Sequence, residues 1–125
     1  MELTENEIIN LKREKIGFLV RNSIPTILKR NLISQSEIEK LQESQYSKFT
    51  FDVNYPVLKK VNEKLSILEN RTINDHTRYY ANPIESNNIK YLYTCEWFER
   101  SQEDFIKWLR RKVTDENNEI KQNLL

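Results

Sequence analysis

The sequence predicts an α+β domain, in which short helices fill the first half and a β-hairpin packs beneath a C-terminal helix. Three observations predict this fold. Helix-start signals recur through residues 1–42, residues 78–97 read as a strand pair, and residues 102–113 carry an apolar stripe at helical spacing. A chain of 125 residues has the length of one domain, which we place at residues 1–113, with a polar tail at 114–125.

Two capping signals mark helices in the first third of the chain. Thr4 and Glu7 have the T-x-x-E spacing of a capping box, and Ser34 and Glu37 repeat it. The second box predicts a short helix that ends near residue 41 or 42.

Pro25 interrupts the apolar pattern between these two boxes. Proline suits the first turn of a helix, so we expect a second helix to begin there, with Ser23 or Ile24 as its cap. Asn31 tolerates a left-handed conformation and is a plausible stop. The first third should therefore be a set of short helices with tight connections.

The middle of the chain carries two competing periodicities. Strict alternation over residues 48–55 is typical of a short strand, although an irregular segment that places its aromatic side chains in the core fits as well. The alternating apolar residues are Phe49, Phe51, Val53 and Tyr55. From Pro56 the spacing of Val57, Val61, Leu65 and Leu68 predicts a helix, and residues 70–77 read as a polar loop.

The last third predicts a hairpin over about 78–97 and a helix over about 102–113. Ser86, Asn87 and Asn88 supply the turn, and Ser101 with Asp104 forms a cap of the S-x-x-D kind. One face of the second strand carries Tyr91, Tyr93, Cys95 and Trp97. This face is core if a helix covers it and a stacking platform for bases if none does; we favour the core.

Composition excludes several classes of function. Gly17 is the only glycine, which leaves no P-loop and no GxGxxG turn, and the formal charge of +1 means that any nucleic-acid role must rest on a local patch. One cysteine and one histidine make neither a disulfide framework nor a standard zinc site, so we expect no cofactor. With no apolar run of membrane-spanning length and no visible signal peptide, we expect a protein of the bacterial cytoplasm.

Two side chains, Cys95 and His76, are candidates for catalysis. Cys95 with His76 across the hairpin would make a nucleophilic pair, and His76 with Arg78 and Tyr79 or Tyr80 would suit a metal-independent ribonuclease. The favoured alternatives are a buried structural cysteine and an exposed loop histidine. We therefore predict no catalytic residue.

Basic residues form the strongest local electrostatic feature. Residues 12–33 hold six basic side chains and one acidic side chain, Glu14, which suits nucleic acid or an acidic protein surface as well as a solvated helix face. A second set lies on the hairpin and the last helix, beside its aromatic residues. The predicted partner-binding residues are Lys12, Arg13, Lys15, Arg21, Lys29, Arg30, Arg78, Lys90, Arg110, Arg111 and Lys112.

Three segments of the chain form a recognisable set, SEIEKLQESQYSKFTFDVNYPVLKKV, RYYANPI and IKYLYTCEWFERSQEDFIKWL. Together they are similar to a small uncharacterised α+β domain of bacterial restriction-, defence- and mobile-element-associated proteins. The matching positions are Tyr46, Ser47, Lys48, Phe51, Asn54, Tyr55, Pro56, Cys95, Trp97, Glu99, Arg100, Trp108 and Leu109. The resemblance carries no activity or catalytic residue; it implies a role in defence or counter-defence, with contact to nucleic acid or its protein complexes.

Abundant Asn, Lys and Ile indicate an AT-rich bacterial or phage genome. Size, composition and resemblance together predict a non-enzymatic inhibitor of the anti-CRISPR or anti-restriction type, which occupies a surface of a protein or ribonucleoprotein effector complex. The alternative is a winged-helix-like DNA- or RNA-binding module that uses the N-terminal cations and the hairpin. A ribonuclease built on His76 is the third hypothesis.

Overall fold

The computed structural model describes residues 15–113 and confirms the α+β fold class. The predicted capping box at Thr4 and Glu7 and the predicted tail at 114–125 lie outside the described residues. In chain order the elements are α2 (Ile16–Lys29), α3 (Gln35–Lys40), α4 (Ser44–Phe51), β1 (Leu58–Lys60), α5 (Ile67–Arg71), β2 (Thr72–Ile73), β3 (His76–Thr77), β4 (Ile84–Ser86), β5 (Ile89–Tyr93), a 3-10 turn (Glu99–Ser101) and α6 (Gln102–Lys112).

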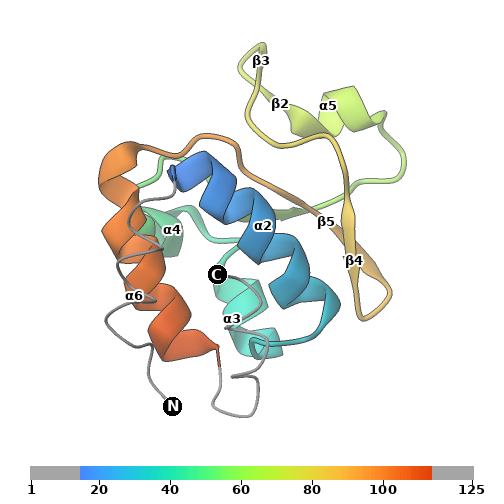
Figure 1. Cartoon of the computed structure of the whole chain (residues 1–125). Coiled ribbons are helices and arrows are strands. Elements are labelled where there is room, and N and C mark those ends of the chain that lie inside the picture. Colours follow the sequence, from blue (N-terminus) through green and yellow to red (C-terminus); the bar gives the residue numbers. More distant parts are fainter. Residues whose placement is uncertain (1–14, 114–125) are drawn as a thin grey trace.

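Helices α2, α3, α4 and α6 gather on one side of the molecule, and strands β4 and β5 run along the other (Figure 1). The main sheet is antiparallel with the order β1-β5-β4, and α2 packs against β4. Residues 62–77, which include α5 and the small β2–β3 sheet, project from this body at the upper right of Figure 1. We call residues 62–77 the arm.

Aromatic side chains form the centre of the helical core. The ring of Phe51 lies edge-on to Trp97 at 5.4 Å and to Trp108 at 5.5 Å, and Phe105 packs against all three. Edge-to-face packing of this kind adds to the stabilisation that burial alone gives. Phe51, Phe105 and Trp108 have no exposed surface, so the aromatic residues of the last helix are core, as predicted.

The aromatic face of β5 is also covered. Tyr91 is 1% exposed and Tyr93 is 7% exposed, while Cys95 and Trp97 beyond the strand are half-buried. The core interpretation of this face is therefore confirmed for its two tyrosines. Leu92 on the opposite face is buried as well, so the middle strand of the sheet is covered on both sides.

Helix α2 passes through Pro25, so the prediction of a new helix at that residue is wrong. Proline removes one backbone hydrogen bond from a helix interior. The helix continues because the apolar residues on both sides of the proline bury against one core: Val20, Ile24 and Ile27 are at most 1% exposed. The predicted stop is confirmed, since Asn31 has a φ of 54°.

At the start of α3 the structure confirms one of the two hydrogen bonds that the second capping box predicts. The hydroxyl of Ser34 accepts the backbone N–H of Glu37 at 3.1 Å, and the helix ends at Lys40 with Leu41 as its C-cap. The carboxylate of Glu37 turns into the protein, where it accepts hydrogen bonds from Tyr46 and Trp108. The glutamate that the sequence assigns to a cap is thus a buried polar contact between helices.

The strand predicted from Phe49 to Tyr55 is helix α4 followed by an irregular segment. Its buried face is made by Ser47 and Phe51, four residues apart and both fully buried. Because one of these residues is polar, the helical period is hidden in the sequence. The Ser47 hydroxyl accepts the N–H of Val57 at 3.0 Å, and Asp52 ends the helix in a left-handed conformation with a φ of 58°.

The helix predicted from Pro56 is wrong for most of its length. Leu58 to Lys60 form β1, whose residues pair with Tyr93, Leu92 and Tyr91 of β5. Long-range pairing with the hairpin overrides the local helical spacing, because it buries Val57 and Leu58. Only Ile67–Arg71 is helical, capped by Ser66 and Glu69, and residues 70–77 hold the end of α5 followed by β2 and β3, where the sequence predicts a loop.

The hairpin is confirmed, with shorter strands than predicted. Asn87 and Asn88 have φ values of 50° and 67°, as a two-residue hairpin turn requires, while Ser86 belongs to β4. Residues 78–83 lie outside β4, although Tyr79 makes an isolated bridge with Thr94. The chain leaves the sheet after Tyr93.

The C-terminal helix is confirmed at Gln102–Lys112 with Ser101 as its N-cap residue, but the predicted capping hydrogen bond of the Ser101 side chain is wrong. Ser101 already has helical backbone angles within the 3-10 turn, and its side chain makes no capping hydrogen bond. The hydroxyl of Ser101 is buried instead.

Candidate functional site: a basic groove between α4 and α6

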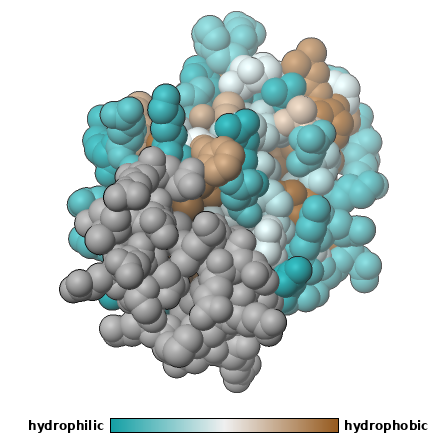
Figure 2. Space-filling view, viewed as in Figure 1, coloured by the Kyte–Doolittle hydropathy of each residue, from teal (hydrophilic) through white to brown (hydrophobic). Residues whose placement is uncertain are grey.

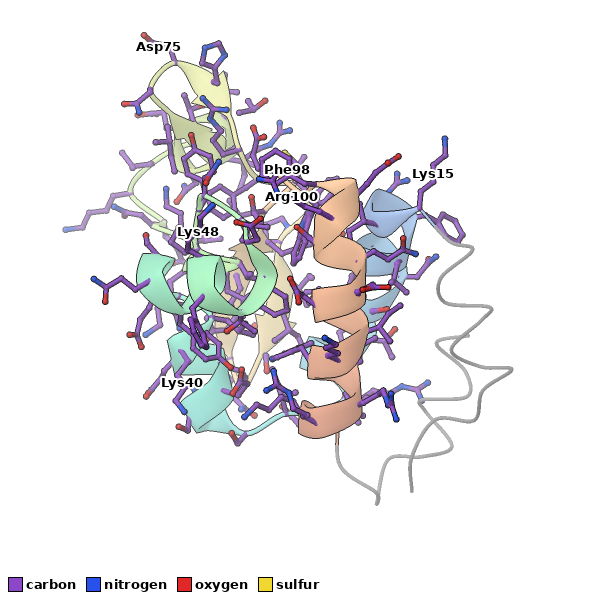
Figure 3. All side chains as sticks on the ribbon, turned by 90° about the vertical axis from the view of Figure 1, so that its left-hand side faces the viewer. Lys15, Lys40, Lys48, Asp75, Phe98 and Arg100 are labelled. Atoms are coloured by element: carbon purple, nitrogen blue, oxygen red, sulfur yellow. The ribbon has the colours of Figure 1, made fainter. Side chains whose placement is uncertain are left out.

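A groove of about 560 Å³ separates α3 and α4 from α6. Figure 3 shows α3, α4 and α6 side by side, with Lys40 at the end of α3 and Lys48 on α4. The groove is lined by Lys40, Tyr46, Phe49, Thr50, Asp104, Lys107, Arg110, Arg111 and Lys112. We call it the α4/α6 groove.

Five of these nine lining residues are cations and one is an anion. Lys107, Arg110 and Arg111 are exposed, and their i, i+3 and i+4 spacing places them on one face of α6. Lys40 supplies charge from the opposite wall, where its ammonium lies 5.9 Å from the centre of the Tyr46 ring. Lys112 is paired with the buried Glu37 and Asp104 also lines the groove, but the remaining cations leave a net positive charge that favours an anionic ligand.

A buried carboxylate lies beside the groove and fixes its walls. Glu37 is 3% exposed and accepts hydrogen bonds from the Tyr46 hydroxyl and, at 2.9 Å, from the Trp108 indole N–H. The ammonium of Lys112 lies 3.4 Å from its second oxygen. One side chain of α3 thus connects α4 to two turns of α6, which holds the two walls at a set distance.

These contacts set the protonation states beside the groove. Burial alone would raise the pKa of Glu37, but the hydrogen bonds from Trp108 and Tyr46 and the charge of Lys112 outweigh it, and the pKa lies below its usual value. Burial and the neighbouring Glu37 carboxylate raise the pKa of Tyr46 to about 12. Near neutral pH Glu37 is therefore an acceptor and Tyr46 a donor.

Phe49 is the most exposed large apolar side chain of the described residues, at 92%. It lines the α4/α6 groove and also borders a second hollow of about 580 Å³ lined by Ser44, Gln45, Lys48 and Asn54. Burying an aromatic ring of this size is among the largest favourable contributions that one side chain makes to binding. Its position between two hollows makes it the most accessible apolar contact beside the cations.

The predicted N-terminal cations do not form one patch. Lys12 and Arg13 lie outside the described residues, while Lys15 and Arg21 lie at the start and middle of α2 and Lys29 and Arg30 at its end. At 1.5 Å per residue, Lys15 and Arg30 are about 22 Å apart along the helix axis. In Figure 3, Lys15 also lies on the other side of α6 from Lys40 and Lys48.

The two predicted hairpin cations have different surroundings. The guanidinium of Arg78 lies 2.9 Å from Glu96 and 5.0 Å from the centre of the Tyr55 ring. Lys90 is exposed on β5 and lies opposite Glu85 of β4 in the strand register. Of the nine predicted residues that lie within 15–113, the structure brings Arg110, Arg111 and Lys112 together in this groove.

Sequence reasoning missed six of the nine lining residues of the groove, among them two of its cations and both of its aromatic side chains. Lys40 lies 67 residues before Lys107 in the chain, and no local pattern connects α3 to α6. Lys107 was visible in the sequence, since it precedes Arg110 and Arg111 by one helical turn. The sequence pattern predicts a strand at Phe49. Tyr46 appears only as a matching position of the resemblance.

Cys95, His76 and Tyr79, the candidates for catalysis, have surroundings that do not favour the chemistry suggested for them. Burial raises the pKa of the Cys95 thiol, which is the opposite of what an activated nucleophile needs. His76 is exposed on β3, and the Tyr79 hydroxyl donates to the Pro56 carbonyl at 3.0 Å. Burial also raises the pKa of Tyr79.

Two further properties concern only the part of the chain that the structure describes. Residues 15–113 contain no group of three or more His, Cys, Asp or Glu side chains that could hold a metal ion. No helix within this range has both the length and the apolar character needed to cross a membrane.

The surface of the arm differs from that of the groove. Figure 2 shows a hydrophobic patch at the upper right, where Figure 1 places α5. The exposed large apolar residues there are Leu65, Ile67 and Leu68.

No protein-family model matches the chain, and neither a curated protein nor a solved structure is significantly similar to it. The resemblance to the defence-associated domain therefore stays a prediction.

Proposed function

We propose that this chain is a non-enzymatic binding protein of a bacterial or phage conflict system. It acts as a small inhibitor of the anti-CRISPR or anti-restriction type, and its α4/α6 groove occupies a surface of a nucleic-acid-handling effector complex. The resemblance to the defence-associated domain supplies the biological context. The observation that carries the proposal is the convergence of five cations and an exposed aromatic ring on one groove.

The construction of the groove supports binding by a preformed surface. The Glu37 contacts hold α3, α4 and α6 together, so little ordering is left for the moment of association. Cations around an aromatic contact are also the arrangement that steers an anionic partner and then excludes water at the centre of the interface.

The proposal is tested by affinity capture from bacterial lysate with three tagged proteins. They are the wild type, the groove variant Lys107→Gln/Arg111→Gln, and the control Lys64→Gln, which removes one exposed cation from the arm. We expect a defined effector complex to be retained by the wild type and the control and lost by the groove variant. Equal capture by all three proteins would contradict the proposal.

A further inference from the structure

The cations of the α4/α6 groove lie on both of its walls. Lys107 to Lys112 cover about 8 Å along the axis of α6, and Lys40 faces them from the end of α3. A concave basic channel of this kind tracks a flexible phosphate backbone, which can enter between two helices. A rigid double helix is better matched by a protruding helix or hairpin, which enters one of its grooves.

Phe49 adds a contact that, among nucleic acids, a single strand satisfies and a duplex does not. In a duplex the faces of the bases are covered by their neighbours, so an exposed aromatic ring finds no partner there. In a single strand each base has a free face, and stacking on an aromatic side chain does not depend on sequence. The ring of Phe49 is 92% exposed and lies at the edge of the basic groove, where a base next to bound phosphates would reach it.

The second hollow beside Phe49 offers polar groups to such a base. Gln45 and Asn54 line it, and both carry side-chain amides; the Asn54 oxygen accepts a hydrogen bond from Lys48 at 3.2 Å, and its NH2 group remains as a donor. An amide both donates and accepts, so it can pair with the edge of any base. Phosphate contacts on one side of the ring and amide groups on the other make a site for a nucleotide unit.

We propose that the α4/α6 groove binds single-stranded nucleic acid, with phosphates on the α6 cations and Lys40 and one base stacked on Phe49. This inference rests on the proposed function: it identifies single-stranded nucleic acid as the part of the effector complex that the groove contacts. An acidic protein surface would also neutralise the cations and bury Phe49; the side-chain amides of the adjoining hollow, which match the edge of a base, favour nucleic acid.

The experiment is fluorescence anisotropy of the full chain with labelled single-stranded oligothymidine and oligouridine, and with a duplex of the same length. Each is titrated across about 50 to 200 mM salt. Phe49→Ala tests stacking, Phe49→Tyr tests its rescue, and Lys107→Gln/Arg111→Gln tests phosphate contact. Lys64→Gln is the matched control on the arm, and a thermal melt of each variant establishes that it is folded.

We expect the single strands to bind more tightly than the duplex. Phe49→Ala should weaken binding about five- to a hundred-fold while keeping the salt dependence, and Phe49→Tyr should restore it. Lys107→Gln/Arg111→Gln should reduce the slope of log K against log salt by about 1.4, since each single-strand phosphate contact contributes about 0.7. Lys64→Gln should change neither quantity.

Two results would overturn the inference. One is equal affinity for duplex and single strand with no effect of Phe49→Ala. The other is no binding of any oligonucleotide at low salt by a folded protein. If the groove variant still loses the effector complex in the capture experiment, the proposed function stands and the contacted partner is an acidic protein surface.

Discussion

Glu37 beneath the α4/α6 groove and Asn70 within the arm are both buried polar side chains, and each one holds a different kind of surface in place. Glu37 connects three helices and lies beside cations. Asn70 has no exposed surface; it accepts the N–H of Asn62 at 2.7 Å and donates to the carbonyls of Asn62 and Ser66. The first residue supports a basic groove, while the second closes a local loop under exposed leucines.

The difference lies in the range of the contacts. The partners of Glu37 lie 9 and 71 residues away in the chain, whereas the side-chain partners of Asn70 lie within eight residues. Long-range contacts among buried groups are lost only when the whole domain unfolds, and local contacts can be lost by opening one segment. We therefore expect the groove to share the global stability of the domain and the arm to open separately.

Glu37→Ala is expected to have the largest effect. It leaves the Tyr46 hydroxyl and the Trp108 indole without their acceptor, and should lower the free energy of unfolding by about 3 kcal/mol in urea denaturation. Glu39→Ala on the same helix is the control; its exposed side chain should change stability by less than about 0.5 kcal/mol. Equal losses for the two variants would show that the buried network contributes little.

Acid should remove part of the Glu37 contribution. The pKa of Glu37 is lowered from its usual 4.5, so the stabilisation is complete above that value and is lost as the pH falls through the lower pKa of the folded protein. The difference in unfolding free energy between wild type and Glu37→Ala should therefore be smaller at about pH 3 than at about pH 6. A difference that stays constant between these two conditions would exclude this carboxylate as the titrating group.

Asn70→Ala should act locally. It leaves the Asn62 N–H without its acceptor, at a cost of about 1 to 3 kcal/mol to the arm, while the Asn62 and Ser66 carbonyls keep the backbone N–H groups of Leu65 and residue 70. Hydrogen exchange should show faster exchange of amides in residues 62–73 with α4 and α6 unchanged. Asn82→Ala, at an exposed position, is the control. Loss of protection throughout the domain would contradict the separation of arm and groove.

Leu68→Ser should have the smallest effect. Leu68 is 60% exposed, so its replacement should change the unfolding free energy by no more than about 0.5 kcal/mol. Oligonucleotide binding in the anisotropy experiment should be unchanged, because the arm is not part of the proposed site. Weaker binding by this variant would place part of the binding surface on the arm.

The sequence predicts the elements that neighbouring residues determine. Its predictions are wrong for the elements that depend on packing or pairing with distant parts of the chain. The Asn87–Asn88 turn, the left-handed stop at Asn31 and the apolar stripe of α6 need only neighbouring residues, and the structure confirms them. The alternation at Phe49–Tyr55 hides a helix because its buried face includes Ser47. Residues 58–60 form a strand because β5, more than 30 residues later, pairs with them.

The candidate site follows the same division. Arg110, Arg111 and Lys112 form one basic run on a predicted helix, and they are the part of the groove that sequence reasoning selected. Lys40 and Phe49 join them only through the packing of α3 and α4 against α6, which the Glu37 contacts stabilise. The run of charge at residues 12–33 does not line this groove, and α2 spreads its described members along one helix.

The most direct test of the groove as the binding surface is a two-dimensional ¹⁵N NMR titration of the full chain with a single-stranded oligothymidine. We predict that the largest chemical-shift changes fall on amides of α4, the end of α3 and residues 104–112 of α6, with the arm unaffected. Changes centred on the arm, on the β4–β5 hairpin or on α2 would contradict the account.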